Sequence, residues 1–299
     1  MFSIITPTYN RQNELHRVYD SLKIQSYRNF QWIIIDDAST DSTDKLVEEW
    51  TKENNDFEIH YHKLKENRGK PFALNFGLDY CTQPITVIAD SDDSFSHNTL
   101  EDLNVLWTQV NQSEESQKVG SIWTLVKDEE GKLVGELYPK NFWQVDFKQR
   151  VLNRKRKVQG EKWHSWRTEI LRKYQFFHND NTNYIGESAT WTKINKDYDF
   201  LCVNIKHRTY YNTADGLINQ QKSKTKVAKI NYYTTFFQLR DANFFELLSI
   251  RYYRTLGFTY IKSNMYYNDS QFRLNWIKKF ACLLAFMSIS VEKIIERIS

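Results

Sequence analysis

Three carboxylates follow a short apolar run in the stretch Val87–Asp93, which reads VIADSDD. The β-branched and small residues predict a buried strand that ends where the acids begin. Acids this close repel one another, and oxygen-only ligands suit Mg²⁺ or Mn²⁺, which share their coordination shell with substrate phosphates. The alternative is a solvated acidic turn leading into the next helix, because Ser94, Ser96 and Asn98 are turn and cap residues.

A second expected strand, residues 31–35, also ends in acids, Asp36 and Asp37. Parallel strands place their carboxyl ends at one edge of a sheet, so we expect the two acidic pairs side by side there. That edge is where open α/β sheets bind ligands. The alternative for Asp37 is a charge at the N-terminus of the following helix.

The elements that must position these acids alternate at the spacing of an α/β fold. No G-x-G-x-x-G turn follows the first strand, and no Walker A motif is present, so a dinucleotide-binding or P-loop site is excluded. The expected strands cover residues 2–6, 31–35, 57–61 and 85–89, and the expected helices residues 12–25, a segment carrying Leu46 to Trp50, and residues 71–80.

Four motifs follow one another over residues 2–105: IITPTYNR from Ile4 to Arg11, IDDASTD from Ile35 to Asp41, N-x-GK-x-x-A-x-N-x-GL from Asn67 to Leu78, and DSDD from Asp90 to Asp93. Together they resemble the inverting family-two glycosyltransferases of GT-A fold, of the bacterial surface-polysaccharide type. The resemblance implies an α/β, Rossmann-like, mixed and mostly parallel sheet flanked by helices, with a helical C-terminal extension. It also implies a nucleotide-sugar donor and a divalent cation, Mn²⁺ or Mg²⁺.

The same resemblance assigns roles to individual residues. Asp37 matches the carboxylate that reads the uracil edge, and Asp92 matches the direct metal ligand. Asp90 matches a residue near the ribose and the metal, so it stands in both the nucleotide and the metal set. The other expected nucleotide contacts are Pro7, Thr8 and Tyr9 as the wall of the uridine pocket, Ser91, and Arg68 and Lys70 near the diphosphate or sugar; Asp93 is a fallback ligand. For Arg68 and Lys70 a merely solvated loop is the alternative.

An inverting transfer needs one carboxylate to take the proton of the acceptor hydroxyl, while the metal neutralises charge on the departing diphosphate. In the family an acidic pair stands four residues before an aromatic, which places the base at Glu187, counted back from Trp191. Gly186 stands where the first acid of the pair is usual, so the motif is altered. Asp180 is the fallback base, and the alternative for Glu187 is an acid at a helix N-terminus.

The second half of the chain carries weaker signals. We expect a helix over residues 100–110, strands over 122–126 and 200–205, and a turn at 127–132 that leads into a further strand over 133–137. His207 or Arg208 could touch the phosphates or simply pack, and residues 214–217 belong to the same expected loop.

Two regions of the chain, one basic and one rich in aromatic and aliphatic residues, each allow more than one role. Residues 148–173 carry ten Lys and Arg against two Glu, which indicates a solvated face, a loop gripping diphosphate, or contact with an acidic glycan or anionic membrane. Residues 231–299 carry apolar residues at helical spacing, which indicates helix packing or, second, docking on a membrane surface.

The composition of the chain limits the class of protein, its compartment and its partners. The 299 residues are 40% apolar and 26% charged with a net charge of +4, too small to argue for nucleic acid. The three cysteines are widely spaced, which predicts buried thiols in a reducing compartment rather than disulfides or a zinc site. Without a signal-peptide pattern or an apolar run of about 18 residues, we expect a cytoplasmic protein that does not cross a membrane.

Together these signals predict a GT-A domain over residues 1–230, with a nucleotide half (1–110) and an acceptor half (111–230), and a helical region over 231–299. The expected activity is metal-assisted transfer of one sugar from a UDP-sugar to a glycan or lipid-linked acceptor, at or near the inner face of the plasma membrane. The alternatives are a nucleotidyltransferase, a glycoside hydrolase, and a nucleotide-binding module that has lost catalysis.

Overall fold

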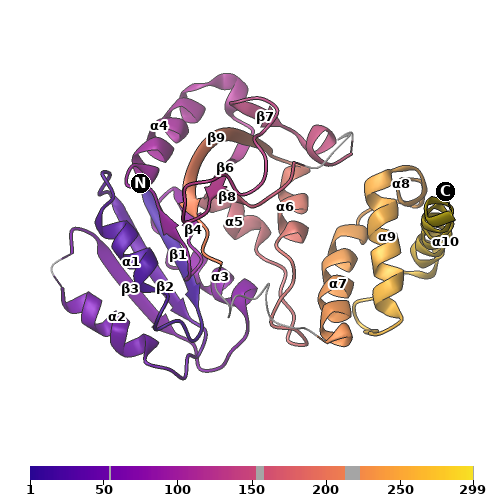
Figure 1. Cartoon of the computed structure of the whole chain (residues 1–299), viewed down its shortest axis with the longest axis horizontal. Coiled ribbons are helices and arrows are strands. Elements are labelled where there is room, and N and C mark those ends of the chain that lie inside the picture. The colour runs from indigo at the N-terminus through magenta and orange to yellow at the C-terminus, as the bar shows by residue number, and fades with distance from the viewer. Residues whose placement is uncertain (54, 153–157, 213–222, 299) are drawn as a thin grey trace. The chain divides into compact units, whose positions relative to one another are not determined.

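The structure is a computed structural model that describes residues 1–53, 55–152, 158–212 and 223–298 (Figure 1). The chain forms two compact units. The first comprises Met1–Phe147, Lys155–Phe176 and Ile194–Thr213, and the second comprises Lys148–Arg154, Phe177–Lys193 and Ala214–Ser299. The boundary predicted at residue 230 stays a prediction.

The first unit is built on one mixed sheet in the order β3-β2-β1-β4-β8-β6-β9-β5, with β7 paired to β9 (Figure 1). The strands β3, β2, β1 and β4 run parallel, whereas β8 is antiparallel to both its neighbours. The strands are β1 (Phe2–Thr8), β2 (Phe30–Asp36), β3 (Glu58–Lys63), β4 (Ile85–Ile88), β5 (Ser94–Phe95), β6 (Val119–Lys127), β7 (Trp143–Val145), β8 (Lys162–Arg167) and β9 (Asp199–Thr209). The helices of this unit are α1 (His16–Lys23), α2 (Thr43–Lys52), α3 (Lys70–Leu78), α4 (Thr99–Gln112) and α5 (Thr168–Tyr174), with a short turn, η1, over Glu114–Ser116.

Burial along the strands explains their sequences. β1, β2 and β4 are buried at every position, as expected for central parallel strands covered on both faces. β3 is the edge strand and is half exposed. The predicted α/β architecture with a mixed sheet flanked by helices is therefore confirmed.

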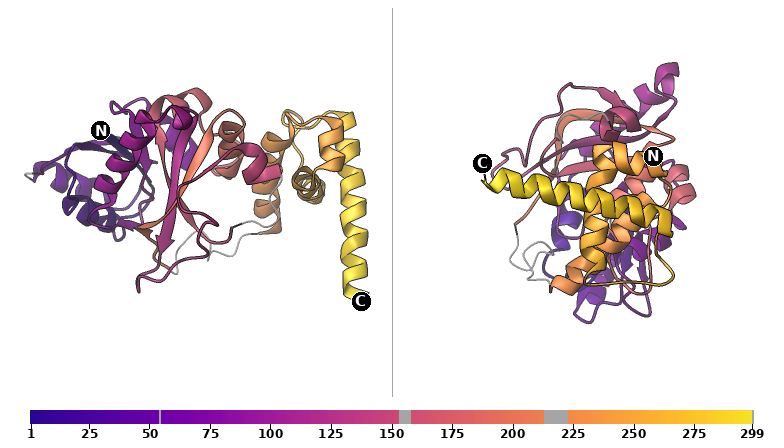
Figure 2. Two further views of the ribbon diagram at one scale, coloured as in Figure 1. Left: turned by 90° about the horizontal axis from the view of Figure 1, so that it is seen from above. Right: turned by 90° about the vertical axis from the view of Figure 1, so that its right-hand side faces the viewer.

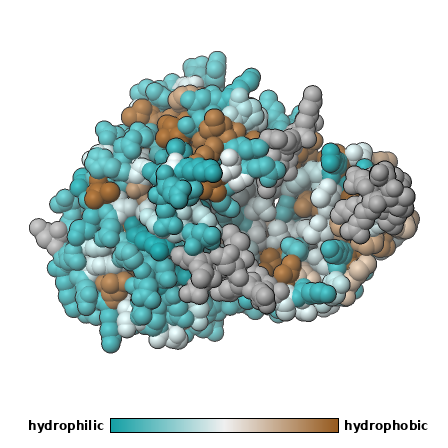
Figure 3. All heavy atoms as spheres, viewed as in Figure 1, coloured by the Kyte–Doolittle hydropathy of each residue, from teal (hydrophilic) through white to brown (hydrophobic). Residues whose placement is uncertain are grey.

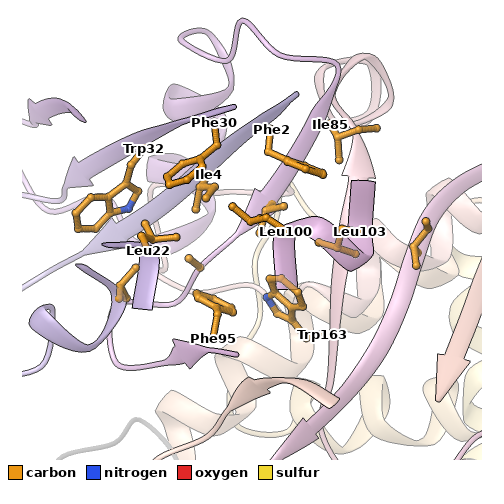
Figure 4. Close-up of a cluster of buried hydrophobic side chains, with 14 of the residues drawn as sticks. Phe2, Ile4, Leu22, Phe30, Trp32, Ile85, Phe95, Leu100, Leu103 and Trp163 are labelled. Carbon is orange, nitrogen blue, oxygen red and sulfur yellow. The ribbon is translucent and has the colours of Figure 1, made fainter. Parts of the chain in front are cut away.

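The main core lies on one face of the sheet (Figure 4). Ile4 and Trp32 from the strands pack there with Leu22 of α1 and Leu103 of α4. On the other face α3 approaches closely, since a Cβ placed on Gly77 would lie 2.9 Å from Cγ2 of Ile5. The helices thus hold the sheet between them, and the ends of β1, β2 and β4 are fixed by this packing.

Two sequence expectations about this unit are wrong. Residues 133–137 form no strand: only Leu133 bridges to Lys127, and Gly135 has a φ of 105° with its backbone against residues 159–160, a conformation that a strand does not allow. Residues 162–167, expected within a basic surface segment, form the inner strand β8, because the four uncharged residues from Trp163 to Trp166 are all buried between β4 and β6. Residues 153–157 of that segment lie outside the described part of the chain.

The second unit is helical and contains η2 (Lys148–Leu152), α7 (Lys224–Leu239), α8 (Phe244–Ser249), α9 (Arg251–Asn264) and α10 (Trp276–Ile298), with most of α6 (Ser188–Asn195). A capping box between Asn243 and Glu246 starts α8. The helices α7 and α10 both pack on α9, and α10 is a long, straight helix (Figure 2). The predicted helical C-terminal region is confirmed.

All three cysteines are buried thiols, as predicted, and none of them forms a disulfide. Within the described residues, none of the helices has the length and apolar character that crossing a membrane requires. On the face shown in Figure 3, the surface of the first unit is largely hydrophilic.

Candidate functional site

The loops that leave β1 and β2 are joined by hydrogen bonds. The backbone N–H of Asp37 donates to the carbonyl of Thr8 at 2.8 Å, and Asn10 exchanges bonds with Ser39 and Thr40. The helix α1 begins at His16, later than predicted, because the segment just before it is tied to the β2 loop through Thr43 and Asp41. The two loops therefore form one rim at the carboxyl edge of the sheet.

The acidic pairs meet at that edge, but not side by side. β1 lies between β2 and β4 in the sheet, so the acids flank the end of β1, where Pro7 and Thr8 stand. Thr8 is buried and its Oγ1 has no hydrogen-bond partner among the described residues, whereas Tyr9 is exposed. The segment expected to line a uridine pocket thus sits between the two acidic strand ends.

The two acids of the first pair have different surroundings. Asp36 is fully buried and accepts hydrogen bonds from the backbone N–H of Ser39 (2.7 Å) and the hydroxyl of Tyr61 (2.6 Å). Asp37 accepts bonds from the backbone N–H groups of Arg68 (2.8 Å) and Gly69 (2.7 Å), at the start of α3. Burial raises the pKa of the Asp37 carboxyl, although these two bonds lower it.

Asp37 therefore fastens the loop of residues 67–70 to the end of β2. Gly69 precedes α3 with a φ of 86°, a backbone conformation that glycine adopts without steric cost. The helix N-terminus that Asp37 touches is that of α3, not of α2 as the alternative interpretation expected. The uracil-reading role of Asp37 stays a prediction.

The next contact joins this loop to the second acidic strand end. Nζ of Lys70 lies 2.7 Å from a carboxylate oxygen of Asp90. Burial alone would raise the pKa of the Asp90 carboxyl, but Lys70 and Arg208 bring it below its usual value, so Asp90 is ionised. The guanidinium of Arg68 instead lies over the ring of Phe72, 3.7 Å from its centroid.

Asp92 is a partly exposed acid of the turn. Its side chain is 30% exposed, and Nη2 of Arg11 lies 3.9 Å from one of its carboxylate oxygens. Its backbone carbonyl accepts a bond from Arg17, whose guanidinium also lies over the ring of Tyr211. Ser91 beside it is buried. The Arg17 contact holds the turn through its backbone, and the Asp92 carboxylate stays partly exposed.

Asp93 has a buried partner that sequence reasoning did not assign. Nε of Arg208, from β9, lies 3.2 Å from a carboxylate oxygen of Asp93, with side-chain exposures of 10% and 3%. Burial raises the pKa of Asp93 well above its usual value, and Arg208 opposes that rise. Burial would lower the pKa of Arg208, but Asp93 and Asp90 raise it overall. Asp93 is thus paired with Arg208, and its fallback role as a metal ligand stays a prediction.

His164 is a second buried group that sequence reasoning left outside the site. Its Nδ1 accepts a bond from Nε1 of Trp166 at 2.7 Å. Burial, with the positive charges of Lys70 and Arg208, lowers its pKa to about 3, so the ring is neutral near pH 7. The signal that could have found it is the uncharged run from Trp163 to Trp166 between Lys162 and Arg167, since a short run without charges is consistent with a fully buried strand.

The remaining predicted residues lie elsewhere. His207 is buried, with Nε2 at 3.2 Å from Asp102 of α4, so its observed contact is one of packing. Glu187 belongs to the second unit and is partly buried, and its carbonyl accepts the bond that starts α6. Asp180 is exposed. Residues 214–217 lie outside the described residues.

Packing accounts for the glycine in the altered acidic motif. The N–H of Gly186 donates to the hydroxyl of Thr234 on α7 at 2.9 Å. A Cβ on Gly186 would lie 3.1 Å from Cγ2 of the same threonine. An acid at this position would therefore push against α7, which leaves Glu187 as the one acid of the pair.

The carboxylates of the first unit suit a cation that the substrate helps to bind. Among the described residues, no group of three or more His, Cys, Asp and Glu side chains could hold a metal on its own. Mg²⁺ and related ions are usually held by one or two carboxylates together with substrate phosphates. Asp90 and Asp92 supply two such groups at the edge of the sheet.

Residues 3–109 match the sequence model of the family described as Glycosyl transferase family 2. The chain is 34% identical over 101 residues to the putative teichuronic acid biosynthesis glycosyltransferase TuaG of Bacillus subtilis, which covers 34% of this chain and 39% of TuaG. It is 32% identical over 104 residues to the poly(ribitol-phosphate) beta-N-acetylglucosaminyltransferase TarS of Staphylococcus aureus, which covers 34% of this chain and 18% of TarS. The chain thus matches about two fifths or less of the length of these relatives.

Solved structures resemble the chain over most of its length. S. aureus TarS 1–349 in complex with UDP-GlcNAc has a TM-score of 0.58 at 16% identity, covering 95% of this chain and 79% of that one. The mannosyltransferase PcManGT of Pyrobaculum calidifontis, in complex with GDP-Man and Mn²⁺, has a TM-score of 0.53 at 19% identity, covering 97% and 75%. At these identities the likeness concerns the fold. The chain has the GT-A fold, and its residues 3–109 match the model of glycosyl transferase family 2.

Proposed function

We propose that this protein is a glycosyltransferase that moves one sugar from a nucleotide-sugar to an acceptor hydroxyl. The observation that carries the proposal is the arrangement of Asp37, the Lys70–Asp90 pair and Asp92 around the end of β1, inside the segment that matches the family. This arrangement offers hydrogen-bond acceptors, a cation and a partly exposed carboxylate within one rim. A nucleoside diphosphate joined to a sugar needs all three.

Asp92, with Asp90, would hold Mn²⁺ or Mg²⁺. The ion, when bound, neutralises charge that develops on the departing diphosphate. Lys70 would share that task, because it is the first residue of α3 and its ammonium group lies beside Asp90 at the second acidic strand end. Arg11, near Asp92, adds a further positive charge beside the turn. The solved complexes of PcManGT and of GalNAc-T7 that resemble this chain contain Mn²⁺.

Glu187 would act as the general base in an inverting transfer. Its carboxylate takes the proton of the acceptor hydroxyl as the oxygen bonds to the anomeric carbon, and the bond from that carbon to the diphosphate breaks on the opposite face. The nucleotide leaves as a diphosphate, so atoms and charge balance. Asp180 is the fallback for this role.

The donor would be a UDP-sugar, since a fold neighbour was solved with UDP-GlcNAc, with a GDP-sugar second because another was solved with GDP-Man. The acceptor would be a surface polysaccharide or a lipid-linked glycan, in line with the names of TuaG and TarS. A cytoplasmic location with peripheral membrane contact belongs to the same proposal.

A thermal-shift panel of nucleotide-sugars, each with Mn²⁺ and with chelator, tests the proposal. A ligand that binds the folded state raises the melting temperature by mass action, so we expect one donor class to stand out with Mn²⁺ only. Release of free UDP in the presence of an acceptor then separates an enzyme from a nucleotide-binding module. A shift with nucleoside triphosphates and release of pyrophosphate would favour a nucleotidyltransferase instead.

A further inference from the structure

The helix α10 carries large apolar side chains on its solvent-exposed face. Trp276 is 78% exposed, Phe280 52% and Met287 54%, and Ile277 and Leu283 are exposed as well. Trp276, Phe280, Leu283 and Met287 follow the i, i+4, i+7, i+11 spacing of one helical face. These five residues, called here the α10 stripe, extend over about 16 Å of helix.

The α10 stripe does not take part in the packing of α10 against its neighbouring helices. The opposite face of α10 carries small residues, Ala281, Cys282 and Ala285, and all three are buried. Gly257 of α9 permits a close approach there, because a Cβ on it would lie 3.2 Å from Sγ of Cys282. The expectation that the apolar residues of this helix form helix packing is therefore wrong for the stripe: the small residues pack on α9, and the large ones face outward.

Basic groups surround the start of the stripe. Arg273 precedes Trp276 and is exposed, and Lys279 is exposed within the first turn of α10. Lys278 donates to the carbonyl of Arg240 and so lies on the packed side. Basic side chains outnumber acidic ones across residues 223–290: Lys224, Lys226, Lys229, Arg240, Arg251, Arg254, Lys262, Arg273, Lys278 and Lys279 against Asp241, Glu246 and Asp269.

We propose that the α10 stripe docks on the surface of an anionic lipid membrane. Aromatic and aliphatic side chains on one face, with basic groups at the edge, are what an interfacial helix presents to lipid, and tryptophan favours the boundary between apolar and wet surroundings. Because the helix stays packed on α8 and α9, the stripe lies along the surface and α10 remains part of the unit.

A second copy of this chain suits the stripe less well. The exposed part of its five side chains amounts to about 500 Å², below the roughly 800 Å² that each partner buries in a stable complex. Two copies would also bring two basic regions together, and like charges oppose such an association. An anionic lipid surface attracts the same charges.

The test is co-sedimentation of the full chain with vesicles of phosphatidylcholine alone and of phosphatidylcholine with phosphatidylglycerol. We expect binding to the anionic vesicles that weakens at high salt. The variant Trp276→Ser/Phe280→Ser should need about tenfold more lipid, or higher, for half binding. Ile24→Ser, which removes an apolar side chain of similar exposure in the first unit, is the matched control and should bind as the native chain does.

Circular dichroism and the melting temperature show whether each variant folds. Because Trp276 and Phe280 are both largely exposed, we expect their substitution to leave the spectrum and the melting temperature unchanged. Two results would overturn the proposal: no binding of the native chain to either vesicle, or equal binding of the stripe variant. A third is self-association of the native chain without lipid that the stripe variant loses, because a second copy would then cover the stripe. The inference rests on the proposed function in that it locates the membrane contact named there, but the vesicle test reads out binding alone and can fail or succeed independently of sugar transfer.

Discussion

The buried pair of Arg208 and Asp93 gives the sharpest test of how the acidic turn is held. Asp93 ends the DSDD motif, and Arg208 comes from β9, more than a hundred residues later. Their side chains are only 10% and 3% exposed, with 3.2 Å between Nε and the carboxylate oxygen. We expect Arg208→Gln to loosen the turn that carries Asp92 as well as to destabilise the fold.

Removing one partner of a buried ion pair costs about 3–5 kcal/mol, because it leaves the other charge uncompensated. Asp93 can escape part of that cost by taking a proton, since burial already raises its pKa. When the pKa of a carboxyl is higher in the folded than in the unfolded state, the folded protein loses stability as the pH rises through the folded-state pKa. We therefore expect Arg208→Gln to cost less at pH 5 than at pH 8.

A double-mutant cycle with Arg208→Gln and Asp93→Asn, followed by urea unfolding, isolates the coupling between the two side chains. We expect a coupling of about 2–3 kcal/mol at pH 7.5, within the range measured for contacting residues. The matched control is the cycle on Lys52 and Glu48, an exposed pair with 69% and 66% exposure, which should give about 0.5 kcal/mol or less. Equal couplings in the two cycles would refute the role assigned to Arg208.

Three further predictions concern the site and its neighbours. Glu187→Gln should lower turnover by about 10²- to 10⁴-fold while leaving donor affinity unchanged, as measured by UDP release and calorimetry; nearly full activity would rule out the base assignment. Asp92→Asn should abolish the difference in UDP affinity between Mn²⁺ and chelator, and a retained difference would place the ion elsewhere. Gly186→Asp should lower the free energy of unfolding by about 1–3 kcal/mol through its clash with α7. The added change Thr234→Ala should recover part of that loss, whereas no recovery would show that the contact at Gly186 is not the cause.

Local sequence was enough to predict the acidic strand ends. The apolar runs of β1, β2 and β4 are fully buried, and a continuous apolar run bounded by turn residues already implies such a strand. The carboxylates that follow need no distant partner to lie at the edge of the sheet, because strand direction alone puts them there. The resemblance to the family over residues 2–105 rests on this same local information, and the family match over residues 3–109 confirms it.

Tertiary structure decided which groups meet at that edge. Strand order put β1 between the two acidic pairs, and β8 and β9 brought His164 and Arg208 to the acidic turn from the far half of the chain. The spacing of apolar residues likewise shows that α10 has two distinct faces. It does not show which of these faces packs against α8 and α9. Pairing and coverage depend on contacts between residues far apart in sequence, and the pattern within one segment does not contain those contacts.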